Sequence, residues 1–229
     1  MHSELKKWEE TSKENQYWDS VKMRKIQEKE AKLMIKWLKK LNRGNYRITE
    51  VGCGNGYLGL KICEFLTEEN KEFSYCLTDL VPECIEKAKK TFADFNKKED
   101  VDFKQLNVYE IDKLLGANSQ DIMISTGFAS AATYKDAVPA VARSLKKDGI
   151  LICDFINHFS PGVFLRNIPK SISRLTRNKK YANDANSKYY HFGRIGIGAY
   201  FERYDLELLE IKHVGLLHNP IVAIFKKMR

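Results

Sequence analysis

Three glycines in five positions stand between a short apolar segment at 47–51 and a helical pattern that begins at Tyr57. Glycines at such a junction let the backbone turn tightly and come within van der Waals range of a ligand. The spacing of Gly52, Gly54 and Gly56 differs from the Gly-x-Gly-x-x-Gly of dinucleotide-binding loops, whose helix start cradles a pyrophosphate. The loop therefore predicts a strand–loop–helix unit that matches dinucleotide binding poorly.

The rest of the chain alternates between helical and strand-like patterns. Met34, Trp37, Leu38 and Leu41 recur at i, i+3, i+4 and i+7 and predict a helix over 21–41. Further strands are expected at 73–80, 101–108, 121–128 and 149–156, and further helices at 57–66, at 82–96 and up to about 146, before a KKDG turn. Strands separated by helices of about 10–15 residues are typical of βαβ units, whose parallel sheet is covered on both faces.

The end of the chain breaks this rhythm. After a helix end at 199–204, the strand-like segments 206–215 and 219–228 follow each other with only a short loop between them. We expect them to form a hairpin that adds one antiparallel strand to an otherwise parallel sheet. All 229 residues fit one α/β domain.

The net charge of +9 is distributed unevenly. Residues 51–157 carry 13 basic and 17 acidic side chains, a net charge of −4. Residues 1–50 carry 13 and 8, and residues 158–200 carry 8 and 1, net charges of +5 and +7. Such asymmetry favours an anionic partner, although a basic face can also be merely solvated. We therefore distinguish an N-terminal helical segment, 1–44, and an inserted basic segment, 158–200.

Several features favour a cytoplasmic protein. No window approaches about 18 consecutive apolar residues, so no transmembrane helix is expected. The charged start, MHSELKKWEETSKEN, has no apolar core of a secretory signal. Five scattered cysteines without a Cys-x-x-Cys pair favour reduced thiols over a disulfide framework or a zinc site.

Asp79 ends the second expected strand, in CLTDL, twenty-three positions beyond Gly56. In a doubly wound sheet, ligands lie outside the carboxyl ends of the strands, near the point where strand order reverses. A carboxylate there can accept hydrogen bonds from both hydroxyls of a ribose. Asp79 could instead, or in addition, cap the helix that begins at Pro82.

The sequence E-V-G-C-G-N-G after a strand, followed by Asp79, resembles the first motifs of class I S-adenosylmethionine-dependent methyltransferases. The resemblance extends over residues 45–157 and again over the closing hairpin. It implies an α/β fold with a seven-stranded doubly wound sheet, mostly parallel with a C-terminal antiparallel hairpin, and helices on both faces. It also implies S-adenosylmethionine as cofactor, S-adenosylhomocysteine (SAH) as product, and no metal.

The resemblance further implies a set of cofactor contacts. The backbone of 52–56 would lie along the methionine part, Glu50 would order the loop and reach the amino group through water, and Asp79 would bind the ribose. Leu80 would pack on the adenine, and Asn107, where many members have Asp, would accept from the adenine amino group. The implied cofactor-binding residues are Glu50, Gly52, Cys53, Gly54, Gly56, Asp79, Leu80, Asn107, Val108, Thr126 and Gly127, the last two beneath the sulfonium.

The residues that determine the specificity for the methyl acceptor are expected in the N-terminal segment and in 128–200. In 158–180, Arg166, Lys170 and Arg174 recur on one helical face, opposite an apolar face. This basic segment could be a cap over the active site with a solvated face, a charged substrate vestibule, or a surface that meets anionic lipid headgroups.

Two histidines are candidates for the general base. His158 directly follows the fifth expected strand and could face the transferred methyl group, and His191 is the second candidate. Either could instead anchor the cap or face solvent. Tyr17, Trp18 and Tyr134 could line the substrate pocket or pack as core residues.

Together these features predict a methyltransferase (EC 2.1.1.-) that acts on oxygen or nitrogen of a small or amphiphilic molecule. The basic segments make an anionic molecule one option for this acceptor, and peripheral membrane contact is a further option. The alternative is an RNA or protein methyltransferase recruited through the basic segments. Nucleic acid is less favoured because no Asn/Asp-Pro-Pro-Tyr/Phe/Trp sequence and no RNA-binding module occurs. A binding module without turnover is a third class, which the intact glycine loop and Asp79 disfavour.

Overall fold

The computed structural model describes residues 21–41, 43–126, 134–155, 194–214 and 221–229. The helices in these ranges are α2 (Val21–Leu41), α3 (Tyr57–Glu68), α4 (Pro82–Thr91), α5 (Ile111–Leu115), α6 (Tyr134–Ser144) and α8 (Arg194–Glu202), with 3₁₀ turns η2 (Lys98–Asp100) and η3 (Val108–Glu110). The strands are β1 (Asn45–Val51), β2 (Glu72–Asp79), β3 (Val101–Gln105), β4 (Gln120–Ser125), β5 (Leu145–Phe155), β6 (Leu206–His213) and β7 (Ile221–Lys227).

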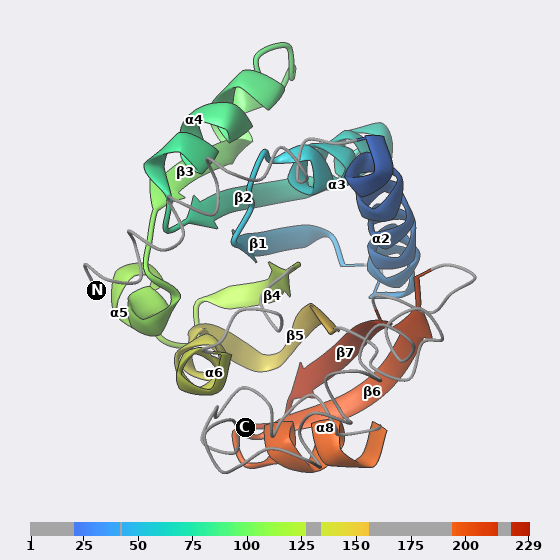
Figure 1. Ribbon diagram of the computed structural model, residues 1–229, viewed down its shortest axis with the longest axis vertical. Helices are drawn as coiled ribbons and strands as arrows, with labels where there is room; N and C mark the ends of the chain where they lie inside the picture. Colours follow the sequence, from blue (N-terminus) through green and yellow to red (C-terminus); the bar gives the residue numbers. More distant parts are fainter. Residues whose placement is uncertain (1–20, 42, 127–133, 156–193, 215–220) are drawn as a thin grey trace, which may run out of the picture.

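The seven described strands form one sheet in the order β3-β2-β1-β4-β5-β7-β6 (Figure 1). Strands β1 to β5 pair in parallel, and β7 is antiparallel to both β5 and β6. This arrangement confirms the doubly wound sheet and the antiparallel closing strand expected from the sequence. Strand order reverses between β1 and β4, so the carboxyl ends of these two strands mark the expected ligand position.

Helices cover both faces of the sheet (Figure 1). One core cluster joins one sheet face to α2, α3 and α4, and a second joins the other face to α5, α6 and α8. Strand β5 shows why both form: Ile150 and Ile152 enter the first cluster, while Leu151 and Cys153 enter the second. Alternating side chains of a strand point to opposite faces, so a strand buried on both sides is apolar throughout.

Helix α2 has the bounds predicted from its apolar spacing. Its C-terminal end lies at the amino end of β1, because the Tyr46 hydroxyl donates to the Leu38 carbonyl over 3.2 Å. Its N-terminal half lies at the start of α3, where the Tyr57 hydroxyl donates to Glu28 over 3.1 Å. The helix therefore runs antiparallel to β1, with its N-terminal half toward the carboxyl edge of the sheet.

Three expected boundaries were wrong. The helix expected over 82–96 ends at Thr91, and the strand expected over 101–108 ends at Gln105. Beyond Gln105 the chain turns, because the Asn107 side chain accepts from the backbone N–H of Tyr109 and starts η3. The KKDG residues belong to β5, although a register shift against β4 and a φ of 62° at Asp148 mark an irregularity there.

Candidate functional site

The glycine loop is tied to the carboxyl end of β2. The backbone N–H groups of Gly52 and Cys53 both donate to the Thr78 carbonyl, over 2.8 and 2.9 Å. The Thr78 hydroxyl in turn donates to the Glu50 carbonyl over 2.8 Å. These bonds hold the loop at the edge where strand order reverses, which is the expected position of a ligand site.

The glycines of this loop are needed for two different reasons. At Gly54, φ is 55°, and an added Cβ would meet nothing within 4 Å, so the backbone borders open space. At Gly56, φ is 75°, and an added Cβ would lie 2.9 Å from the Cβ of Ala88. Gly54 thus leaves room beside the backbone, whereas Gly56 lets α3 pack closely on α4.

Asp79 connects this loop to the next turn. Its Oδ2 accepts from the Gly54 N–H and its Oδ1 from the Val81 N–H, both over 2.9 Å. Val81, not Asp79, is the N-cap of α4, so Asp79 supports the helix start without capping it. Burial raises the pKa of Asp79, and the backbone N–H donors oppose that rise. Backbone N–H groups of Val81, Gly54 and Leu80 all bond to this carboxyl, which has about four acceptor sites, so one remains for a further donor such as a hydroxyl.

Glu50 lies beneath the loop and is 1% exposed. Its Oε2 accepts from the Tyr75 hydroxyl over 2.9 Å, and its Oε1 has no hydrogen-bond partner among the described residues. Burial raises the pKa of Glu50 to about 8, although the bond from Tyr75 opposes the rise. A Cβ at Gly59 would lie 2.6 Å from Oε2, so this glycine makes room for the carboxyl.

Sequence reasoning missed Tyr75 and Gly59. The only available signal was indirect, since Tyr75 lies in an apolar strand on the same face as Glu50 and Gly59 follows the start of α3 by two residues. The register that pairs Ile48 with Tyr75 across β1 and β2 places the tyrosine within reach of Glu50.

The other described candidates occupy varied positions around the loop. Cys53 is buried, and burial raises the pKa of its thiol, so it is a neutral core residue. Asn107 uses its side-chain oxygen to accept from the Tyr109 N–H over 3.2 Å, which leaves one lone pair for an adenine amino group. Leu80 is half-buried, and Val108 packs against the second core cluster.

Thr126 lies beside the loop, since its carbonyl is 4.0 Å from the position of a Cβ on Gly52. The side chain of Tyr134 and the residues Tyr17, Trp18, Gly127, His158, Arg166 and His191 lie outside the described residues. The same holds for most of the basic segment 158–200 and for residues 1–20 of the N-terminal segment.

The described residues fit a ligand of the adenosyl amino acid type. Gly54 leaves open space beside the backbone, and Asp79 offers an acceptor to hydroxyls at the carboxyl edge. Glu50 offers a buried acceptor that has no partner within the described part of the chain. An ammonium group would supply the donor that this Glu50 oxygen lacks.

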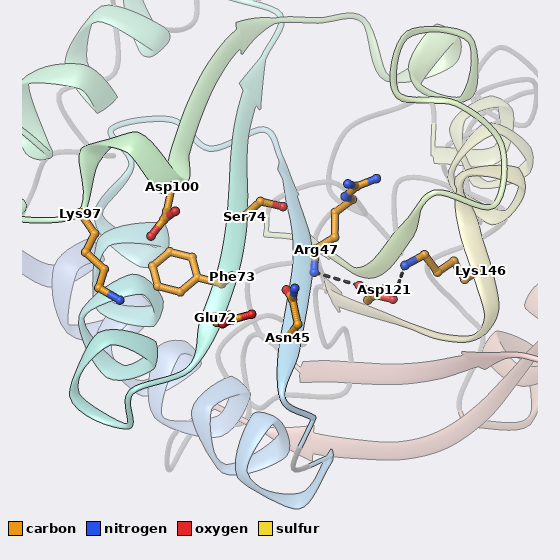
Figure 2. A pocket seen from close by; sticks show the side chains of 9 residues that line it. All are labelled: Asn45, Arg47, Glu72, Phe73, Ser74, Lys97, Asp100, Asp121 and Lys146. Atoms are coloured by element: carbon orange, nitrogen blue, oxygen red, sulfur yellow. Dashed lines mark hydrogen bonds and ion pairs between the residues drawn. The ribbon is translucent and has the colours of Figure 1, made fainter.

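A cavity of about 690 Å³ lies at the opposite, amino edge of the sheet (Figure 2). Its lining residues are Asn45, Arg47, Glu72, Phe73, Ser74, Lys97, Asp100, Asp121 and Lys146. Asp121 accepts from the Arg47 N–H over 2.9 Å and pairs with Lys146 over 2.8 Å. Because ligands of doubly wound sheets bind at the carboxyl ends, this cavity is not the candidate site.

Among the described residues, no three His, Cys, Asp or Glu side chains are arranged to hold a metal ion. None of the described helices combines the length and apolarity needed to cross a membrane.

A comparison with family models matches residues 42–197 to a methyltransferase domain. No curated protein sequence matches the chain significantly. Among solved structures, magnesium protoporphyrin IX methyltransferase from Synechocystis PCC 6803, with bound SAH, has a TM-score of 0.64 at 12% identity, with 91% of this chain and 88% of that one covered.

A methyltransferase from Aquifex aeolicus, described as S-adenosylmethionine-dependent, has a TM-score of 0.58 at 13% identity, covering 84% and 88% of the two chains. The CurJ carbon methyltransferase has a TM-score of 0.62 at 17% identity, covering 86% of this chain and 53% of the other. The chain thus spans about half the length of that carbon methyltransferase. At these identities the structural likeness shows the fold, and the family rests on the match to residues 42–197.

Proposed function

The chain belongs to the methyltransferase-domain family and is an S-adenosylmethionine-dependent enzyme, and from this premise we propose that it methylates oxygen or nitrogen of a small or amphiphilic molecule. The observation that carries the cofactor site of this proposal is the position of Asp79. Its two oxygens join the glycine loop to the start of α4 at the carboxyl edge of β2, beside the open space at Gly54.

Three described groups would hold the cofactor. The backbone at Gly54 would lie along the methionine part, Asp79 would accept from the ribose hydroxyls, and Glu50 would accept from the ammonium group. When bound, S-adenosylmethionine supplies an activated methyl carbon to an in-line nucleophile. The contribution of the protein is alignment of the two reactants, together with a base where the nucleophile carries a proton.

The loop and its supports are organised in advance for that alignment. Thr78 fixes the loop through two N–H groups and Tyr75 orients Glu50, so little conformational freedom is left for a ligand to remove. The three buried thiols of Cys53, Cys63 and Cys153 are not nucleophiles here, because burial raises their pKa and keeps them protonated.

A small acceptor is supported by the Synechocystis neighbour, which covers most of both chains and whose name specifies a porphyrin. Within the same proposal, the basic segment 158–200 acts as a cap over the site, where it would favour an anionic part of the acceptor or a membrane surface. His158 and His191 remain the proposed bases. Recruitment of RNA or protein by these charges is the second candidate function.

Labelled methyl transfer tests the proposal. The protein is incubated with tritiated S-adenosylmethionine and a cell lysate that is then separated into small-molecule, lipid, RNA and protein pools. We expect label in the small-molecule or lipid pool, and none with Asp79→Ala protein. Label confined to RNA or protein would favour the second candidate, and no transfer into any pool would support a binding module without turnover.

A further inference from the structure

We propose that five lysines on α2 dock the protein on an anionic lipid surface. The five residues are Lys25, Lys29, Lys32, Lys36 and Lys39, and we refer to them below as the lysine row. The inference goes beyond the proposed function, because it concerns a surface outside the cofactor site.

The spacing of the lysine row places its side chains along one line of the helix surface. Its members follow one another at intervals of four, three, four and three residues, and all five are exposed. At about 100° per residue, these positions fall within an arc of about 80°. At about 1.5 Å per residue, the fourteen residues between its ends make the row about 21 Å long.

The lysine row faces away from the core. Ala31, Met34 and Leu38 lie on the opposite side of α2 and are buried in the first core cluster. In Figure 1, α2 lies at the right-hand side of the molecule, outside the sheet. Because the apolar side of α2 packs against the protein, the row would meet a surface through its charges and not by insertion among lipid tails.

Most of these charges are not balanced by an acid. Within the described part of the chain, Lys25, Lys29, Lys32 and Lys36 form no ion pair. Lys39, at the C-terminal end of the row, pairs with Glu69 of the residues after α3 over 3.1 Å. Four consecutive members of the row therefore present their charges to solvent.

The two acids of α2 do not balance the lysine row either. Glu28 accepts from the Tyr57 hydroxyl over 3.1 Å and forms no ion pair with a described lysine. Glu30 is buried, and burial, followed by the charges of Asp154 and Glu50, raises its pKa to about 9. Glu30 is therefore neutral near pH 7, and the exposed side of α2 is strongly positive.

Two other described helices balance their lysines within the helix. Lys61 pairs with Glu64 on α3 over 2.6 Å, and Lys89 pairs with Glu86 on α4 over 2.7 Å. Like charges three or four residues apart instead destabilise a helix, and the lysine row contains four such neighbouring pairs. Alternation of lysine with glutamate would solvate this face without that cost, so the unbalanced row indicates an anionic partner.

The residue types of the row fit a lipid surface better than a nucleic acid. Lysine carries a compact charge without a fixed direction, whereas nucleic-acid sites typically combine the planar fork of arginine with aromatic side chains that stack on bases. Arg24 and Trp37 are on other sides of α2, where Arg24 lies 6.0 Å from the Tyr57 ring and Trp37 donates to Glu210 over 2.7 Å. Helices with about four to eight clustered basic residues are typical of contact with anionic lipids.

The direction of α2 connects the lysine row to the cofactor site. The N-terminal half of α2 lies toward the carboxyl edge of the sheet, where Glu28 accepts from Tyr57 at the start of α3. Lys25 and Lys29 stand on either side of Glu28 in the helix. A lipid surface along the row would therefore extend to the edge at which the proposed acceptor enters.

Vesicle co-sedimentation tests the inference. The protein is mixed with vesicles of phosphatidylcholine alone, or with about 30% phosphatidylserine, at about 0.05 and 0.5 M salt. We expect partitioning at least tenfold stronger onto the phosphatidylserine vesicles at the lower salt concentration. The preference should disappear at the higher one, because salt screens exposed charges.

A variant of the lysine row gives the specific test. Lys25→Gln, Lys29→Gln, Lys32→Gln and Lys36→Gln together should lower partitioning onto phosphatidylserine vesicles to the level of phosphatidylcholine. Far-UV circular dichroism and thermal unfolding verify the fold, and the melting temperature should stay the same or rise because like charges are removed. SAH affinity, measured without vesicles, should stay within threefold of the wild type.

The matched control removes the same charge elsewhere. Lys90→Gln, Lys104→Gln, Lys113→Gln and Lys147→Gln together change exposed lysines on α4, β3, α5 and β5. Because these positions are scattered over the molecule, partitioning onto the phosphatidylserine vesicles should stay within threefold of the wild type.

Several outcomes would overturn the inference: equal partitioning onto both kinds of vesicle, a preference that survives in the row variant, or an equal loss in the control, which would assign the effect to net charge. A single-stranded RNA that binds through the row, without binding to the anionic vesicles, would assign the row to nucleic acid and also overturn it. Failure of the wild-type protein to bind SAH would instead count against the proposed function, while the vesicle experiment would still decide the role of the row.

Discussion

The acidic groups at the two edges of the sheet differ in how many hydrogen-bond and ion-pair partners they have. At the amino edge, Asp121 is surrounded by donors: it accepts from the Arg47 N–H and pairs with Lys146 and Arg43. At the carboxyl edge, Glu50 keeps one oxygen without a partner among the described residues, although it is far more deeply buried. A buried acceptor can lack a protein donor where a bound ligand supplies the hydrogen bond. This difference indicates that the carboxyl edge binds a ligand, whereas the acid at the amino edge stabilises the fold.

The largest expected effect is on the glycine loop. Gly54→Val places a β-branched side chain at a φ of 55° and in the open space beside the backbone. SAH affinity should fall by more than 100-fold in calorimetry, with far-UV circular dichroism near that of the wild type. Gly44→Val is the control, since Gly44 has open space but no positive φ and lies near the amino edge. Retained binding by Gly54→Val would contradict the close approach of a ligand.

Aspartate removal at each edge sharpens the comparison. Asp79→Ala removes the acceptors proposed for the ribose and the support of the Gly54 N–H, so SAH affinity should fall at least tenfold. Asp121→Ala leaves three donors without their partner and should lower stability by about 1–3 kcal/mol, with SAH affinity unchanged. Equal effects of the two substitutions on affinity would remove the distinction between the edges.

The pH dependence of stability reports on the buried acid. The pKa of Glu50 is raised to about 8 in the fold, whereas the unfolded chain ionises near 4.5. Between these values the folded protein binds more protons than the unfolded chain, so stability falls as pH rises from about 5 to 8, by up to about 1.4 kcal/mol per pH unit. Urea unfolding at pH 5, 6.5 and 8 measures the slope, which Glu50→Gln should reduce. An unchanged slope in the variant would assign the effect to other groups.

The smallest expected effect concerns a partly exposed ion pair of the amino edge. Lys146→Ala removes the ion pair with Asp121. The Lys146 side chain is 43% exposed in this pair. Such pairs contribute about 0.2–1 kcal/mol, so the unfolding free energy should fall by no more than that and SAH affinity should not change. A loss of SAH affinity on this substitution would show that the cavity in Figure 2 is energetically coupled to the cofactor site.

Much of this architecture was predictable because its signals are local. The strand–loop–helix junction at the glycines, the period of α2 and the closing hairpin all follow from neighbouring residues, and the sheet confirms each of them. Helix α5 was missed because five residues are too short to show a helical period. The end of β3 was misplaced because a side chain, Asn107, turns the backbone there.

The candidate site was predictable only in part. Glu50, Gly54 and Asp79 could be named because a local motif and a strand end mark them. Tyr75 could not, since its role depends on the parallel register that sets it beside Glu50. Gly56 is expected to border the ligand, which stays a prediction, and the structure adds a packing reason for this glycine against Ala88.

By itself, then, the sequence determined the alternation of strands and helices, the position of the loop and the acid that follows it, because hydrophobic period and glycine spacing act over a few residues. Only the tertiary structure decided that Glu30 lies close enough to Glu50 and Asp154 for their charges to raise its pKa. These residues are up to 124 positions apart, and their proximity depends on the docking of α2 and the register of three strands. Contacts of that kind are set by packing between distant elements, and no local pattern records them.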